Sequence, residues 1–294
     1  MALTWAYDRT VTADLHSYRF GPSGPAQILA IHGLTGHGRR YEEIANEHLA
    51  EFSVLAPDLI GHGRSGYAAP WTIEANVVAL TALLDAEDSG PVVVVGHSFG
   101  GAVALALAAA RPDLVRGLVL LDPAVALDGG WMAEIADAML SSPDYPDREQ
   151  ARADKLSGSW REVAERDPAV LEGELDEHLI SLPNGRLGWR ISVPAAMSYW
   201  SELTRPVPLP RSGTPTTLIR ATRTTPPYAT DELIATLRDA VGEEFTLTEL
   251  DCDHMVAQAL PAETAAIIRG HRGSGRSGAR TGRPDPGGSR QYLR

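Results

Sequence analysis

The chain of 294 residues has a single cysteine and no long apolar run. Because Cys252 stands alone, an intrachain disulfide is excluded and a reducing compartment is expected. No uncharged apolar run approaches the ~20 residues that a membrane span requires. Residues 1–8 have neither the basic nor the apolar segment of a signal peptide. We therefore expect a cytoplasmic protein.

Positive charge is also scarce. The sequence has 26 lysines and arginines against 38 aspartates and glutamates, which gives a net charge of −12, and Lys155 is the only lysine. This balance argues against nucleic acid and anionic membranes as partners. The sequence contains no H-E-x-x-H, and no pair of its histidines has the spacing of a helical metal site. We expect no metal and no cofactor, and a small-molecule substrate.

The most informative stretch lies near residue 98. Residues 92–95 are four valines in a row, as in a strand buried on both faces, and residues 102–110 are rich in alanine and leucine, which favours a helix. Between them, Gly96-x-Ser98-x-Gly100 places Ser98 at the tip of a strand–turn–helix unit. So tight a turn requires residues without a Cβ at its crossing points. Ser98 is the predicted nucleophile.

Elsewhere strands and helices are predicted to alternate. Strands are expected at 11–20, 27–31, 52–56, 92–95, 115–121, 216–221 and 245–250, and helices at 41–50, 73–84, 102–110, 231–241 and 261–269. Such alternation implies an α/β fold of parallel strands with right-handed crossovers and helices on both faces.

One segment interrupts the alternation. Residues 124–212 contain no convincing buried strand but have amphipathic stretches at 131–140 and 160–175. We expect this segment to be a helical cap, inserted between core segments 1–123 and 213–269. Residues 270–294 are rich in glycine, serine and arginine and are expected to form a disordered tail.

Four motifs stand in one order along the chain: His32-Gly33 after an early strand, Asp58 to Ser65, Gly96 to Gly101, and Asp253-His254-Met255 after the last strand. With these motifs, residues 26–269 resemble the α/β-hydrolase superfamily. The resemblance implies a mostly parallel, eight-stranded sheet, a helical cap after the sixth strand, and acyl transfer by a Ser-acid-His triad.

The partners of Ser98 follow from chemistry and from the resemblance. A serine hydroxyl is a weak nucleophile until an imidazole takes its proton, and His254 stands where the fold would bring it to Ser98. The adjacent His97 is interpreted as a packing residue. Two backbone N–H groups are expected to form the oxyanion hole, that of Phe99 after the nucleophile and, by resemblance, that of Leu34.

The acid departs from the family pattern. Thr224 occupies the position after strand 216–221 where most members have a carboxylate. Asp122, at the end of strand 115–121, is the expected replacement. Asp231 is the competitor, although it also looks like a helix-start residue. A third possibility is that no carboxylate completes the triad.

The cap supplies candidates for a substrate pocket, namely Trp131 and Trp200, together with His32 of the core, for which a structural role is also favoured. An aromatic cap favours an apolar substrate. The predicted function is that of a serine hydrolase cleaving a small or medium apolar carboxylic ester, lactone or thioester. Open alternatives are a C–C bond hydrolase, perhydrolase or lyase with the same triad, or a catalytically weakened ligand-binding protein.

Overall fold

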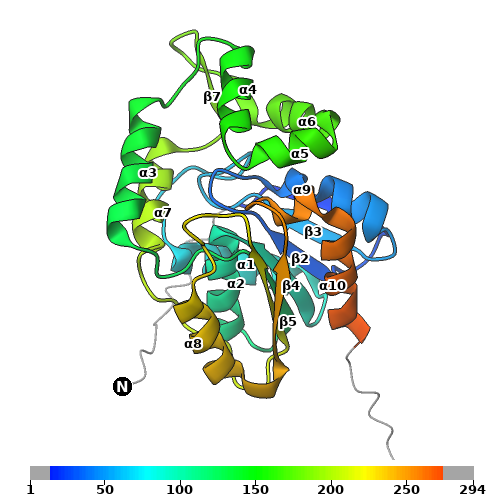
Figure 1. The fold of residues 1–294 in the computed structure, drawn as a ribbon. Helices are drawn as coiled ribbons and strands as arrows, with labels where there is room; N and C mark the ends of the chain where they lie inside the picture. Colours follow the sequence, from blue (N-terminus) through cyan, green and yellow to red (C-terminus); the bar gives the residue numbers. More distant parts are fainter. Residues whose placement is uncertain (1–13, 274–294) are drawn as a thin grey trace, which may run out of the picture.

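A seven-stranded sheet forms the centre of the computed structural model, which describes residues 14–273 (Figure 1). The strand order is β1-β3-β2-β4-β5-β8-β9, with β1 antiparallel to β3 and every other pair parallel. The strands are β1 Ser17–Phe20, β2 Ile28–Ile31, β3 Val54–Pro57, β4 Val92–His97, β5 Val115–Leu121, β8 Thr216–Ala221 and β9 Phe245–Leu250.

The four valines of β4 explain how the sheet is packed. Val92 and Val94 belong to the hydrophobic core on one face of the sheet, and Val93 and Val95 belong to the core on the other. Side chains of a strand alternate between faces, so a strand covered on both sides needs apolar residues throughout. All six residues of β4 are buried.

Helices cover both faces, as predicted. The face of Val92 packs against α1 Ile73–Glu87, α2 Phe99–Ala110 and α8 Asp231–Val241. The face of Val93 packs against the 3₁₀ helix η1 Gly38–Tyr41, the π-helix η2 Ile44–His48, α9 Val256–Ala259 and α10 Pro261–Gly273. The expected helix over 41–50 is thus a 3₁₀ turn followed by a π turn.

The segment between β5 and β8, residues 124–212, contains five helices and is called the cap below. They are α3 Gly129–Ser141, α4 Arg148–Ser157, α5 Trp160–Arg166, α6 Pro168–His178 and α7 Val193–Glu202, drawn in green above and beside the sheet (Figure 1). A short hairpin, β6 Leu179–Ser181 with β7 Leu187–Trp189, was not expected. The predicted helix over 160–175 divides at Asp167, because Asp167 caps α6 and Pro168 begins it.

Three boundaries differ from the sequence-based expectation. The described sheet has seven strands, five of them before the cap, where the resemblance implied eight and six. Part of the strand expected at 11–20 lies outside the described residues. Helix α10 continues to Gly273, beyond the expected start of the tail at residue 270, and residues 274–294 of that tail lie outside the described residues.

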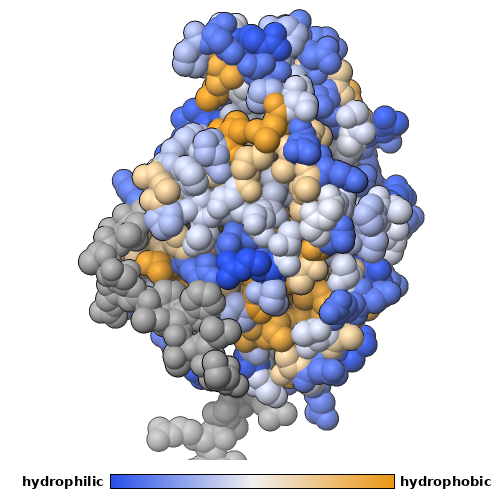
Figure 2. Space-filling view, turned by 90° about the vertical axis from the view of Figure 1, so that its left-hand side faces the viewer, coloured by the Kyte–Doolittle hydropathy of each residue, from blue (hydrophilic) through white to orange (hydrophobic). Residues whose placement is uncertain are grey.

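The surface of the described residues is mixed in character. One face shows separate hydrophobic patches among hydrophilic residues (Figure 2). Tyr67 and Leu140 are the large hydrophobic side chains that are exposed among the described residues. Within the same part of the chain, no helix has both the length and the apolar character needed to cross a membrane.

The backbone is so closely packed around the turn between β4 and α2 that Gly96 and Gly100 have no room for a side chain. A Cβ on Gly96 would lie 2.4 Å from the Gly100 carbonyl oxygen, and a Cβ on Gly100 would lie 2.4 Å from the Ile31 carbonyl oxygen. Any side chain there would push β2, β4 and α2 apart. The turn is therefore fixed by backbone packing against the neighbouring strand.

We expect Gly100→Ala to lower the free energy of unfolding by about 3 kcal/mol or to prevent folding, because the contacted atoms are backbone. Gly173→Ala in α6 is the matched control, since no atom lies within 4 Å of its Cβ position. That variant should be stabilised by up to about 1 kcal/mol through helix propensity. Urea denaturation measures both, and equal stability of the two variants would contradict the packing argument.

Candidate active site

Ser98 lies between β4 and α2 in a backbone conformation that L residues rarely adopt, with φ 52° and ψ −119°. Hydrogen bonds hold it there. Its N–H donates to the Leu121 carbonyl (3.0 Å), and its carbonyl accepts from the N–H groups of Gly101 (2.8 Å) and Ala124 (3.1 Å). Ser98 lines a cavity of about 410 Å³ between the core and the cap.

His254 lies in the loop between β9 and α9 and lines the same cavity as Ser98. Its Nδ1 lies 2.6 Å from Oδ2 of Asp122. This contact sets the tautomer with the proton on Nδ1, and it leaves Nε2 as the nitrogen able to accept a proton from a serine. The structure thus places a histidine–carboxylate pair at the cavity that Ser98 lines.

Asp122 follows β5 and is fully buried. Its N–H donates to the Ile219 carbonyl at 2.8 Å, and its Oδ1 accepts from the Ala221 N–H at 3.3 Å, so both ends of the residue are tied to β8. The competing Asp231 has a side chain that is 88% exposed and pairs with Arg220 instead. The structure brings Asp122, and not Asp231, to His254.

Thr224, at the usual acid position, has a different contact. Its hydroxyl donates to Oδ1 of Asp253 at 3.3 Å, and the same oxygen accepts from the His254 N–H at 2.6 Å. The Asp253 N–H in turn donates to Glu162 of α5 at 2.7 Å. Thr224 and the cap residue Glu162 therefore both support the loop that carries His254.

The His32-Gly33 segment packs directly against the serine. A Cβ on Gly33 would lie 2.8 Å from Nδ1 of His97 and 3.0 Å from the Cβ of Ser98. Leu34 follows this contact and lines the cavity. Phe99 is the first residue of α2, so its N–H has no acceptor within the helix. The predicted oxyanion-hole residues, Leu34 and Phe99, therefore flank Ser98.

The cavity is lined by apolar and polar side chains. The apolar ones include Ile135 and Met139 of α3 and Trp200 of α7, and the polar ones include Arg40, Asp154 and Lys155. The apolar part of this lining can bury hydrocarbon.

Of the three predicted pocket residues, Trp200 lines this cavity, and His32 and Trp131 are not among the residues that line it. The His32 ring is buried and makes two hydrogen bonds to the backbone. Its Nε2 accepts from the Leu59 N–H (2.9 Å), and its Nδ1 donates to the Gly33 carbonyl (2.8 Å). Burial lowers its pKa well below the usual range. Trp131 packs on Tyr228, with 4.9 Å between ring centroids.

Three comparisons with known proteins agree with this fold. A model of the alpha/beta hydrolase family matches residues 28–267. The chain belongs to the alpha/beta hydrolase family. It is 61% identical over 260 residues to lipase LipV of Mycobacterium tuberculosis, an alignment covering 88% of this chain and 98% of LipV. The family and fold class predicted from the four motifs are confirmed.

Solved structures also resemble this alpha/beta hydrolase. E-2-(acetamidomethylene)succinate hydrolase superposes with a TM-score of 0.73 at 19% identity, covering 88% of this chain and 95% of the other. A marine microorganism esterase gives 0.71 at 22% identity, covering 88% and 99%. At these identities the likeness establishes the fold alone.

In this hydrolase the ring of Tyr228 stacks on His254, with 4.0 Å between centroids and 27° between planes. Burial, with a contribution from the Asp122 charge, raises the pKa of Tyr228 to about 12. His97 donates from Nε2 to the His254 carbonyl at 2.8 Å, and burial lowers its pKa well below the usual range. The rings of Tyr228 and His97, which both contact the His254 ring, are therefore uncharged at neutral pH. No residue spacing in the sequence indicates the stacking of Tyr228.

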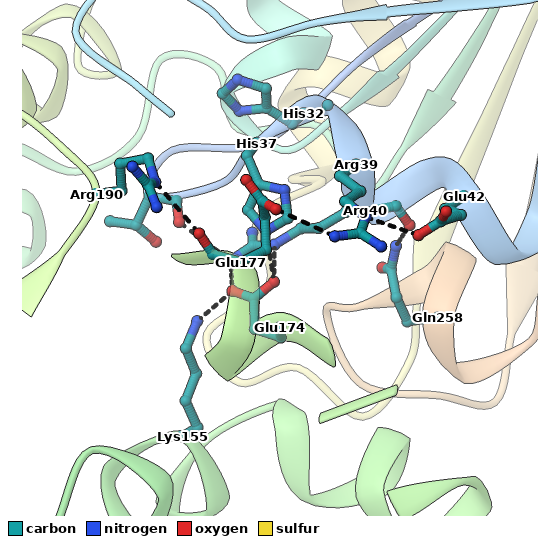
Figure 3. A network of polar contacts seen from close by, with 12 residues as sticks. His32, His37, Arg39, Arg40, Glu42, Lys155, Glu174, Glu177, Arg190 and Gln258 are labelled. Carbon is teal, nitrogen blue, oxygen red and sulfur yellow. Dashed lines mark hydrogen bonds and ion pairs between the residues drawn. The ribbon is translucent and has the colours of Figure 1, made fainter. Parts of the chain in front are cut away.

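A buried polar cluster joins the cap to the core around Glu174 of α6 (Figure 3). Its carboxylate contacts Nε2 of His37 (2.9 Å), Nε of Arg40 (3.0 Å) and Nζ of Lys155 (2.8 Å). The Lys155 ammonium also lies over the rings of Trp160 and Trp189. Burial lowers the pKa of Lys155 to about 8. Sequence reasoning missed this cluster because its members are far apart in the chain.

A cluster of possible metal ligands and the single cysteine lie elsewhere in the described part of the chain. Glu43, Glu47 and His48 offer three ligand atoms within 4.8 Å of one another, but Glu43 pairs with Arg166 and Glu47 is exposed. Cys252 is fully buried, and burial raises the pKa of its thiol to about 12. Neither group borders the cavity beside Ser98.

We expect Asp122→Asn to lower kcat for ester hydrolysis by about 10³–10⁴-fold, because the amide does not fix the Nδ1 proton of His254 or stabilise an imidazolium. Asp231→Asn is the control and should retain full activity, since its side chain is exposed. Steady-state kinetics of the two purified variants distinguish them. If Asp231→Asn loses activity and Asp122→Asn does not, the geometric assignment is wrong.

Proposed function

We propose that this alpha/beta hydrolase is a serine carboxyl-ester hydrolase that acts on small or medium apolar esters, lactones or thioesters. The observation that carries the proposal is the 2.6 Å contact between His254 and Asp122 at the cavity lined by Ser98. A hydroxyl, an imidazole and a buried carboxylate in this arrangement can perform acyl transfer.

The proposed reaction has two halves. Ser98 Oγ attacks the ester carbonyl while His254 Nε2 takes the serine proton, and the resulting oxyanion faces the N–H groups of Leu34 and Phe99. The intermediate collapses to an acyl-enzyme, and the leaving alcohol takes the proton from His254. Water, whose proton His254 takes, then attacks the acyl group, the carboxylic acid leaves, and the proton returns to Ser98 Oγ. Asp122 keeps the imidazole oriented and balances its positive charge throughout.

The cavity and the relatives support an ester as substrate. Ile135, Met139 and Trp200 offer an apolar surface beside Ser98. LipV, which is 61% identical to this chain, is named a lipase. The alternative of a weakened, ligand-binding site was motivated by Thr224, and the contact of Asp122 with His254 favours a complete triad instead.

The test compares the protein with its Ser98→Ala variant on p-nitrophenyl esters from acetate to octanoate. We expect Ser98→Ala to lose at least ~10³-fold in kcat/KM, since removing the nucleophile disables the triad. A fluorophosphonate probe should add one label to the wild-type protein, at Ser98. Ser89→Ala, in the loop between α1 and β4, is the control and should keep both properties. Equal ester hydrolysis by the wild type and Ser98→Ala would defeat the proposal.

A further inference from the structure

We infer that Arg40 is a positioning residue for the oxyanion hole, and that Glu174 of the cap holds Arg40 in place for this task. This inference rests on the proposed function, because it assigns a role in stabilising the oxyanion on the Ser98 adduct. It makes the cap a contributor to the reaction as well as a wall of the cavity.

The first step is the contact of Arg40 with the loop that follows β2. One guanidinium nitrogen of Arg40 donates to the Thr35 carbonyl at 3.0 Å. Thr35 follows Leu34, the proposed donor, and has φ 61°, in the left-handed region. A threonine there needs support from its surroundings. Arg40 supplies this support through the Thr35 carbonyl, one residue after Leu34, the proposed oxyanion donor.

The second step is the clamp on Arg40 itself. Its side chain is 6% exposed and is held by both carboxylate oxygens of Glu174, whose side chain is 1% exposed. Burial raises the pKa of Glu174, but the charges of Arg40 and Lys155 outweigh burial and hold that pKa well below its usual range. Glu174 therefore stays ionised. A bidentate pair of this kind fixes the plane of the guanidinium as well as its position.

The third step is a link from Arg40 to the segment after the base. The Gln258 side-chain amide donates to the Arg40 carbonyl at 2.8 Å. Gln258 lies in α9, which begins two residues after His254. Figure 3 shows Arg40 with Glu174 and Lys155 of the cap near it and Gln258 beside its backbone. Arg40 thus contacts the oxyanion loop, the cap and the helix that follows the base.

The neighbouring residue provides a matched comparison. Arg39 also lies in η1 and also pairs with a glutamate of α6, Glu177, one turn from Glu174. Its side chain is 44% exposed, and its guanidinium binds Glu42 and Glu177 rather than the Thr35 carbonyl. Both arginines join η1 to α6, but of the two it is Arg40 that also contacts the Thr35 carbonyl.

The experiment measures ester hydrolysis and inhibition by an aryl trifluoromethyl ketone, which forms a tetrahedral adduct with an active-site serine. Arg40→Lys keeps the charge but loses the planar fork. We expect kcat to fall by about 10–100-fold, less than the ~10²–10³ typical for complete loss of one oxyanion donor, with KM changed less than threefold. The inhibition constant of the ketone should rise by the same factor as kcat falls.

Arg39→Lys is the control and should leave kcat, KM and the ketone inhibition constant within twofold of the wild type. Glu174→Gln provides a second variant if Arg40→Lys does not fold, and its control is Glu177→Gln. We expect Glu174→Gln to lower kcat and weaken the ketone by about 3–10-fold in parallel, because Arg40 loses its charged partner. Circular dichroism verifies that each variant is folded.

The possible outcomes separate this inference from the proposed function. If hydrolysis does not depend on Ser98, both are overturned. If hydrolysis depends on Ser98 but folded Arg40→Lys or Glu174→Gln binds the ketone as tightly as the wild type, only the positioning role is overturned. A loss confined to KM, or an equal loss in Arg39→Lys, also contradicts it.

Discussion

The structure depends most on the contact between backbone atoms at the β4–α2 turn. Gly100 approaches the carbonyl of Ile31, the last residue of β2, too closely to admit a Cβ. This approach ties the turn that carries Ser98 to the loop that carries Leu34. The nucleophile and one proposed oxyanion donor are therefore placed by the same packing contact, before any side chain of the cap is involved.

Charges buried between cap and core are the second organising feature. Removing a carboxylate from water is costly unless partners compensate for the lost hydration. Glu174 has three such partners, and Glu162 accepts the Asp253 N–H beside the base. A buried ion pair is a weak source of net stability, but removal of one partner is strongly destabilising because the other charge is left uncompensated. Helix α6 thus reaches the loop after β2 through Arg40, and helix α5 reaches the loop that carries His254.

Local patterns predicted the elements of the core but not the contacts between distant ones. The strands at 115–121, 216–221 and 245–250 have the predicted bounds. The first two are mostly buried, whereas the third lies at the edge of the sheet and alternates apolar and polar residues. Contacts across the chain carry no spacing signal, so Glu174 and Tyr228 went unpredicted. The contact of Trp131 with Tyr228 has a related origin: the residue type indicates burial, but the packing of α3 decides which side chain it meets.

Asp122 contacts His254 although it lies outside the usual sequence position of the triad acid, and the order of the strands in the sheet explains this. β5 and β8 are neighbours in the sheet, so a carboxylate after β5 lies about one strand spacing from the usual position after β8. Asp122 is bonded to β8 through both its N–H and its Oδ1, and its Oδ2 remains to meet His254. Thr224, which has no charge, stands at the usual acid position and supports the His254 loop through its hydrogen bond to Asp253. The same imidazole can therefore be oriented from either strand end, because what the proposed chemistry requires is a buried carboxylate oxygen at Nδ1 and not a particular place in the sequence.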